Sequence, residues 1–207
     1  MKVKICGLRE PENIAALARL QPDFMGFIFY PPSPRYVAAS ALEAPLGQLP
    51  QSIRRVGVVV NQAIEELLAI GHQLRLDFFQ LHGTESPEVC QHLRDSGFGT
   101  IKAFAMRPGF NWATVAPYEG KVDYFLFDTA TKNFGGSGRQ FDWHLLQGYT
   151  GATPFFLSGG LGPESLENIQ QLNHPALVGL DANSRLEIRP GLKDVQKSKE
   201  LINAFKT

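Results

Sequence analysis

The chain has 207 residues, with 20 Lys or Arg and 20 Asp or Glu, so its formal net charge is zero. A neutral chain lacks the basic surface that binds nucleic-acid backbones, and we expect no nucleic-acid partner. The first residues contain no secretory apolar region, and the longest apolar run, around residues 24–30, is too short to span a bilayer. We therefore expect a cytoplasmic protein with no membrane partner, and this length predicts one domain over residues 1–207.

Eight short runs along the chain are rich in β-branched and aromatic residues, and each predicts a β-strand. Most are apolar throughout, which is typical of parallel strands covered on both faces. The runs lie at residues 2–6, 24–29, 55–60, 78–81, 100–105, 124–127, 154–157 and 177–180.

Helix-like stretches separate these runs, so strands and helices alternate along the chain. This order predicts an α/β fold, and the count favours a closed (β/α)₈ TIM barrel over an open doubly wound sheet. Two crossovers are weaker: residues 38–49 contain Pro45 and Gly47, and residues 110–118 form a short segment, so we expect one outer helix to be reduced. The clearest helical stretches are residues 11–20, 62–70, 86–96, 141–146, 163–172 and 194–205.

Active sites of such barrels lie at the carboxyl ends of the strands. Cys6 ends the first strand, where a thiolate can act as a base; the alternative is a small buried residue. A free thiol has a pKa of about 8.5, and Lys4, on the same face of the strand, is a cation that can lower it. Asp128 ends a very apolar strand, where burial would keep it protonated as a proton donor. A loop cap or a partner of Lys132 is an equally good interpretation of Asp128.

A phosphate site is predicted after the last two strands. Gly159 and Gly160 follow the seventh strand and allow the backbone to approach an anion, although a tight turn alone would also explain them. Asp181, Asn183 and Ser184 follow the eighth strand, and this pair of turns is where such barrels commonly bind phosphate.

Three other strand-end features are weaker. Arg35 lies on a loop stiffened by prolines, where it can bind a carboxylate, although a solvated surface arginine is the more common case. His82 is a polar wall of the site or a structural histidine. Residues 135–138, Gly-Gly-Ser-Gly, form a mobile lid or a plain flexible connection.

The remaining reactive side chains carry no site of their own. Cys90 lies between apolar residues of a predicted helix, which indicates a residue of the hydrophobic core. Two cysteines in a cytosolic chain predict no disulfide. The other histidines lack metal-ligand spacing, and no nucleotide-binding or serine-hydrolase motif is present, so we expect no metal.

Taken in order, these strand ends resemble phosphoribosylanthranilate isomerases, the TrpF family of tryptophan biosynthesis. The resemblance covers nearly the whole chain and rests on a series of motifs: residues 4–7 (Lys-Ile-Cys-Gly), 26–29, 33–35 (Ser-Pro-Arg), 56–61, 80–83 (Gln-Leu-His-Gly), 127–129 (Phe-Asp-Thr), 135–138, 141–143, 158–161 (Ser-Gly-Gly-Leu) and 190–194 (Pro-Gly-Leu-Lys-Asp).

The resemblance implies a cofactor-free barrel that converts N-(5-phosphoribosyl)anthranilate to 1-(2-carboxyphenylamino)-1-deoxyribulose 5-phosphate by an Amadori rearrangement. By position, the family's general base matches Cys6, its general acid Asp128 and its carboxylate ligand Arg35, and its phosphate-binding backbone matches Gly159, Gly160 and the turn after the eighth strand. The family commonly has Asp-x-Ser-Ser-Gly in that turn, whereas this chain ends it with Arg185. Either the turn differs locally, or Arg185 adds a cation near the phosphate.

Three alternatives stand beside this interpretation. Indole-glycerol-phosphate synthase would need a catalytic lysine core that these strand ends do not provide, and a pentose-phosphate epimerase would need paired aspartates with metal-binding histidines. A barrel that only binds a phosphorylated metabolite would need neither an acid nor a base. The expected partner is therefore a small phosphorylated substrate, and the chain is expected to be a monomer or a homodimer.

Overall fold

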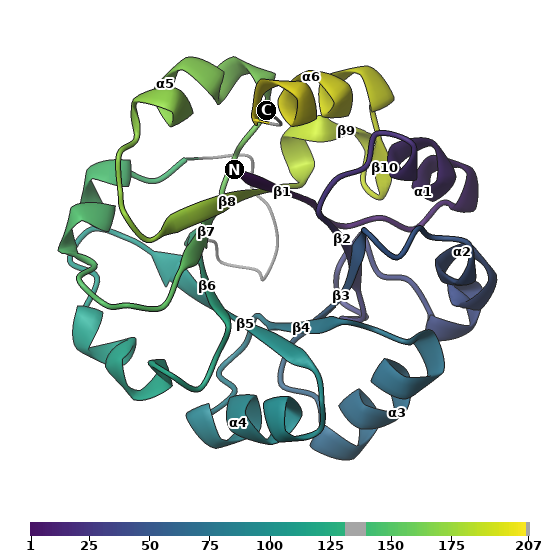
Figure 1. Ribbon diagram of the computed structural model, residues 1–207, viewed down its shortest axis with the longest axis horizontal. Helices are drawn as coiled ribbons and strands as arrows, with labels where there is room; N and C mark the ends of the chain where they lie inside the picture. Colours follow the sequence, from purple (N-terminus) through teal and green to yellow (C-terminus); the bar gives the residue numbers. More distant parts are fainter. Residues whose placement is uncertain (131–139, 206–207) are drawn as a thin grey trace.

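A computed structural model describes residues 1–130 and 140–205, in which eight parallel strands form a closed barrel in chain order (Figure 1). The ring closes between the first and last strands, where Lys4 lies opposite Asp181. All eight strands predicted from the sequence are present, with ends that differ by at most two residues. They are β1 (Lys2–Ile5), β2 (Phe24–Ile28), β3 (Arg54–Val59), β4 (Phe78–Leu81), β5 (Gly99–Met106), β6 (Tyr124–Thr129), β7 (Phe155–Leu157) and β8 (Leu177–Ala182).

Helices form an outer ring around the strands (Figure 1). Each turns an apolar stripe toward the barrel: α3, for example, buries Leu67, Gly71 and Leu74, which recur at helical spacing. This layer covers the outer faces of strands that are apolar on both sides. The α-helices are α1 (Pro11–Ala18), α2 (Glu43–Gly47), α3 (Ile64–Leu74), α4 (Pro87–Asp95), α5 (Leu166–Gln171) and α6 (Val195–Phe205).

The outer ring is thinnest after β5 and β6. Residues 110–118 form only two 3₁₀ turns, Trp112–Thr114 and Ala116–Tyr118, which confirms a reduced helix there. The helical stretch predicted at residues 141–146 is present as a 3₁₀ helix, Trp143–Gly148. The Asp142 side chain caps this segment by accepting a hydrogen bond from the backbone N–H of His144 at 3.0 Å, and the segment ends at Gly148.

Aromatic rings fill the amino-terminal half of the barrel interior. Phe24 lies 5.5 Å from Phe78 and 5.3 Å from Phe156, and Tyr124 lies 5.2 Å from Phe156, all measured between ring centroids. Edge-to-face contacts of this kind pack the interior densely. Smaller and polar side chains occupy the opposite half, so the space for a ligand lies at the carboxyl ends of the strands.

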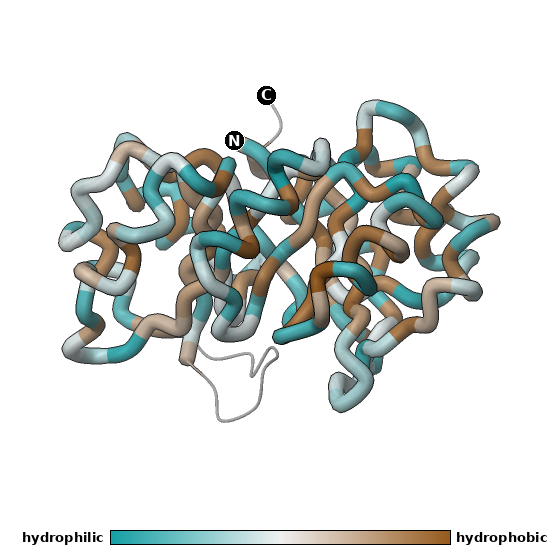
Figure 2. Tube along the Cα trace, turned by 90° about the horizontal axis from the view of Figure 1, so that it is seen from below, coloured by the Kyte–Doolittle hydropathy of each residue, from teal (hydrophilic) through white to brown (hydrophobic). Residues whose placement is uncertain are grey.

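A short antiparallel pair, β9 (Glu187–Arg189) and β10 (Leu192–Lys193), follows β8 and precedes α6. The side chain of Asn13 in α1 fixes it with two hydrogen bonds of 2.9 Å to the backbone of Lys193. Met1 and the end of α6 lie on the same side of the barrel (Figure 2), where the amino group of Met1 donates to the carbonyl oxygen of Phe205. Among the described helices, none is long and apolar enough to cross a membrane.

Candidate active site

A cavity of about 580 Å³, counting its open mouth, lies at the carboxyl ends of the strands. Eight of the nine site residues predicted from the sequence line it, and Arg35 is the exception. The lining residues are Cys6, Ile28, Tyr30, Ser33, Val58, Val60, Gln80, His82, Asp128, Ser158, Gly159, Gly160, Asp181, Asn183 and Ser184.

Cys6 shares its corner of the cavity with a buried ion pair. The Lys4 ammonium is fully buried and donates to Asp181 Oδ1 at 2.9 Å. The same ammonium lies against the thiol: a Cβ placed on Gly26 would meet Cys6 Sγ at 2.8 Å and Lys4 Nζ at 3.0 Å. Gly26 therefore leaves the space in which thiol and ammonium meet, and Asp181 holds the ammonium in place.

The thiol is the resting form of Cys6. Burial raises the pKa of the Cys6 thiol above its ordinary value, and the positive charges of Lys4 and Lys193 oppose this rise. Burial alone would lower the pKa of Lys4, but the charges of Asp181 and Cys6 raise it, so Lys4 stays protonated. The cation beside Cys6 therefore does not make the thiolate the main form in the free site. Desolvation outweighs the neighbouring cations, and the thiolate is a minor form that these cations make accessible.

Asp128 has the ionisation that the sequence predicts. Burial and the nearby negative charge of Asp181 raise the pKa of Asp128 to about 7, although a backbone hydrogen bond from Thr129 at 2.8 Å favours the carboxylate. At neutral pH a large share of Asp128 is therefore protonated and able to donate a proton. The carboxyl group faces the cavity from the end of β6, across the barrel from β1.

His82 stands beside Asp128 as a neutral imidazole. Burial and the charge of Lys102 lower the pKa of His82 to about 4. The Gln80 amide donates to Nδ1 of the ring at 2.9 Å, so the ring proton is on Nε2, which lies 3.6 Å from Asp128 Oδ2. His82 is thus a polar wall of the cavity that presents an N–H group to the carboxyl.

The turn after β7 is built to approach an anion. Gly159 and Gly160 have φ of +94° and +66°, a region that disfavours side chains, and a Cβ on Gly159 would meet the Thr129 side chain. Among the described residues, no group accepts a hydrogen bond from the backbone N–H of Gly159 or Gly160. Two backbone donors therefore remain available at the wall of the cavity.

The turn after β8 lines the cavity next to the turn after β7, and it accommodates Arg185 without strain. Asn183 Oδ1 accepts a hydrogen bond of 2.6 Å from Lys193 Nζ. Arg185 lies in the right-handed 3₁₀ turn Ser184–Leu186 and has no positive φ, so the turn has a local form that needs no glycine. The Arg185 side chain is exposed, and its Nε lies 3.6 Å from Glu164 Oε1.

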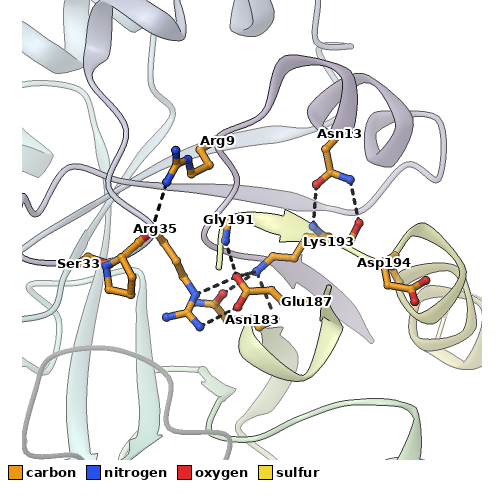
Figure 3. A network of polar contacts seen from close by, with 11 residues as sticks. Arg9, Asn13, Ser33, Arg35, Asn183, Glu187, Gly191, Lys193 and Asp194 are labelled. Atoms are coloured by element: carbon orange, nitrogen blue, oxygen red, sulfur yellow. Dashed lines mark hydrogen bonds and ion pairs between the residues drawn. The ribbon is translucent and has the colours of Figure 1, made fainter. Parts of the chain in front are cut away.

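Arg35 is buried beside the cavity, so the surface interpretation of this residue is wrong. Its guanidinium donates from Nε and Nη2 to the two carboxylate oxygens of Glu187, at 2.8 Å and 2.7 Å (Figure 3). No sequence motif assigns a role to Glu187 or, by itself, to Lys193. The one available signal was the motif at residues 190–194, which includes Lys193.

The other predicted features fall outside the site. Cys90 is buried in α4 within the hydrophobic core, and burial raises the pKa of its thiol to about 11, which confirms the core interpretation. The glycine-rich residues 135–138 lie outside the described residues. Within the described part of the chain, no three His, Cys, Asp or Glu side chains form a group that could hold a metal ion.

Comparisons with known proteins agree on one family. Residues 3–204 match the family model of N-(5'-phosphoribosyl)anthranilate (PRA) isomerase. A relative of that name from Parabacteroides distasonis is 47% identical over 203 residues, which are 98% of this chain and 92% of the relative.

Solved structures give the same result. The phosphoribosyl anthranilate isomerase of Thermotoga maritima has a TM-score of 0.89 at 32% identity, with 99% of this chain and 98% of that chain covered. A phosphoribosyl anthranilate isomerase in complex with reduced 1-(o-carboxyphenylamino)-1-deoxyribulose 5-phosphate has a TM-score of 0.86 at 30% identity, with 99% and 97% covered.

Proposed function

The chain belongs to the N-(5'-phosphoribosyl)anthranilate isomerase family, and from this premise we propose how its residues carry out the reaction. The protein is an isomerase of tryptophan biosynthesis. Its reaction converts N-(5-phosphoribosyl)anthranilate to 1-(2-carboxyphenylamino)-1-deoxyribulose 5-phosphate. One observation carries the assignment of residues: a thiol beside a buried cation and a carboxyl with a pKa of about 7 face one cavity.

Asp128 is the general acid of this proposal. It donates a proton to the ring oxygen of the ribose, the bond from that oxygen to C1 breaks, and the nitrogen lone pair forms a C=N bond. The product of this step is a protonated Schiff base. A carboxyl that is half protonated near neutral pH suits this transfer, because the donor is abundant and its conjugate base is stable.

Cys6 is the general base. The C–H group next to the Schiff base is acidic, and the thiolate removes its proton to give an enolamine. The enolamine tautomerises to the ketone, so the net number of protons is unchanged. The thiolate forms when the Cys6 thiol releases its proton to solvent. The Lys4 ammonium beside it and the positive charge of the Schiff base both favour this ionisation.

The remaining residues position the substrate in this proposal. The backbone of Gly159 and Gly160, with Asn183 and Ser184, binds the phosphate. Arg35 binds the anthranilate carboxylate from beside the cavity. Holding both ends of the substrate places the reacting carbon between acid and base, which by itself lowers the barrier.

Asp181 and His82 support the acid and the base. Asp181, which the sequence analysis assigned to substrate binding, accepts hydrogen bonds from Lys4 and from Ser158 Oγ at 3.2 Å, so it orients the cation beside Cys6. His82 directs an N–H group at Asp128. We further propose a single cytoplasmic domain, a monomer or homodimer, that needs no cofactor and binds no nucleic acid.

The proposal is tested with the purified chain and freshly prepared phosphoribosylanthranilate. Loss of the anthranilamide fluorescence reports the reaction, and NMR of the mixture identifies the ketone product. We expect loss well above the buffer rate. Binding of substrate without conversion would contradict the proposal and favour a barrel that only senses a phosphorylated metabolite.

A further inference from the structure

A buried ionic cluster lies directly behind the cavity, where the loop after β2 meets the β9 and β10 pair. Figure 3 shows the Arg35 guanidinium and the Lys193 ammonium directed at the same carboxylate, that of Glu187. Lys193 Nζ lies 2.8 Å from Glu187 Oε1, and Arg35 Nη2 lies 2.7 Å from Glu187 Oε2. The Gly191 backbone N–H donates to Glu187 Oε1 at 3.0 Å, which fixes the carboxylate further.

The cluster contains two cations and one anion. The side chains of Arg35, Glu187 and Lys193 are 8%, 5% and 0% exposed. Burial works to raise the pKa of Glu187, but the hydrogen bond from Arg35 and the charge of Lys193 hold it below its ordinary value, so the carboxylate is ionised. Burial lowers the pKa of Lys193 to about 8, at which the ammonium is still mostly charged near neutral pH. An excess positive charge with little solvent favours an anionic ligand nearby.

Lys193 connects the cluster to the phosphate side of the cavity. Its ammonium donates to the backbone oxygen of Asn183 at 3.2 Å and to Oδ1 of the same residue at 2.6 Å. Asn183 lines the cavity together with Gly160. The turn after β8 is therefore held in place by a cation that is itself held by Glu187.

Arg35 connects the cluster to the other side. Glu187 accepts hydrogen bonds from Nε and Nη2 of the Arg35 guanidinium, and Nη1 has no hydrogen-bond partner among the described residues. A Cβ on Gly7 would meet Asn183 Oδ1 at 2.7 Å and Arg35 Cδ at 2.8 Å, so the two arms of the cluster converge at this glycine. Bidentate pairing fixes the plane of a guanidinium and thereby aims its remaining N–H groups.

We propose that Glu187 is a positioning residue that fixes both anion-binding ends of the cavity, orienting Arg35 directly and the turn after β8 through Lys193. The inference rests on the proposed function, because that function says which group of the ligand binds at each end of the cavity. It explains why a buried carboxylate that does not line the cavity lies so close to the proposed phosphate site.

The test measures the two ends separately and at equilibrium. Anthranilate binding is followed by its own fluorescence, and inorganic phosphate binding by the rise in the unfolding midpoint that it causes. In the Glu187→Gln variant, which keeps the side-chain shape but loses the charge, we expect both dissociation constants to rise at least about tenfold. A matched control is Glu10→Gln, which removes a half-buried carboxylate paired with Arg189 and should change neither constant. Weakening of only one end, or of neither, would overturn the proposal.

A double-mutant cycle separates positioning from general damage to the fold. If Glu187 acts through Arg35, then adding Glu187→Gln to Arg35→Lys should weaken anthranilate binding by much less than it does in the parent protein, while phosphate binding still falls by the full factor. For turnover, we expect KM to rise by a larger factor than kcat falls. Additive losses at both ends would show a purely structural role and would overturn the proposal.

A second variant tests the proposal if Glu187→Gln does not fold. Lys193→Gln then takes its place and should weaken phosphate binding at least about fivefold more than anthranilate binding, because Glu187 still holds Arg35. Equal losses at the two ends would then refute the coupling. Both binding assays are independent of catalysis, so absence of turnover in the parent protein would contradict the proposed function and leave this measurement valid.

Discussion

Lys4 and Asp181 form an ion pair of 2.9 Å across the seam where β1 closes on β8, and neither side chain is more than 5% exposed. The pair places a fixed positive charge beside the Cys6 thiol. The charge of Asp181 raises the pKa of Asp128 and so favours the protonated acid. The same charge also raises the pKa of Cys6, whereas the Lys4 ammonium that Asp181 holds lowers it.

The first prediction concerns the pH dependence of kcat/KM. Below pH 7 Asp128 is protonated, and the rate should rise with pH as the thiolate fraction of Cys6 grows. Above about pH 7 the falling fraction of protonated Asp128 offsets the rising fraction of Cys6 thiolate, so kcat/KM should reach a plateau near pH 7. It should fall only above the pKa of Cys6. Steady-state kinetics across this range provide the check, and a rate that continues to rise steeply through pH 8 would contradict these roles.

The second prediction isolates the cation. Lys4→Met removes the charge that favours the thiolate, so the plateau of kcat/KM should drop at least about tenfold, the effect of one pKa unit. The break near pH 7 should move no lower, because Lys4 also works to lower the pKa of Asp128. The pH profile of kcat/KM for the variant tests this, after circular dichroism has shown that the variant is folded. An unchanged plateau would show that Lys4 does not act on Cys6.

The third prediction concerns the space between thiol and ammonium. Gly26→Ala would place a methyl group 2.8 Å from Cys6 Sγ and 3.2 Å from Cys6 Cα, so we expect a loss of about 1–3 kcal/mol in the free energy of unfolding and a fall in kcat. Gly47→Ala, where no atom lies within 4 Å of the new methyl, is the control. Urea denaturation and turnover of both variants test this, and equal behaviour would refute the crowding argument.

The fourth prediction links the acid to stability. In the unfolded chain the Asp128 carboxyl ionises near 3.8, and in the folded protein near 7. Between these values the folded state holds a proton that the unfolded chain has released, so this group's contribution to stability falls as pH rises from about 4 to 7. Asp128→Asn should therefore be more stable than the parent at pH 8, by on the order of 1 kcal/mol, and far less active. Lower stability at pH 8, measured by denaturant titration, would contradict the raised pKa.

The barrel and its mouth could be predicted from the sequence because the signals are local. Each strand is an apolar run bounded by turns, and the residue after each run points to the carboxyl end of the barrel. Cys6 and Asp128 were identified in this way. The stretch at 141–146 is helical as its apolar pattern predicts, but its 3₁₀ form could not be predicted, because this pattern does not distinguish the two helical forms in a short segment.

The ionic cluster could not be predicted from the sequence because its members meet only in the folded barrel. Arg35 and Glu187 are 152 positions apart, and no local pattern pairs them. The resting state of Cys6 could not be predicted for a related reason. Its pKa depends on the balance between complete burial and the charges of Lys4 and Lys193, which is set by tertiary packing and not by the residues adjacent in sequence.

The central claim, that Cys6 is the base of this isomerase, is tested most directly by comparing the two cysteines in one assay. Both thiols are buried, but Cys6 faces the cavity and Cys90 lies in the core. We predict that Cys6→Ala lowers kcat for phosphoribosylanthranilate by at least about a hundredfold, whereas Cys90→Ala changes it by no more than about threefold. Near-parental turnover in a folded Cys6→Ala variant would contradict the account.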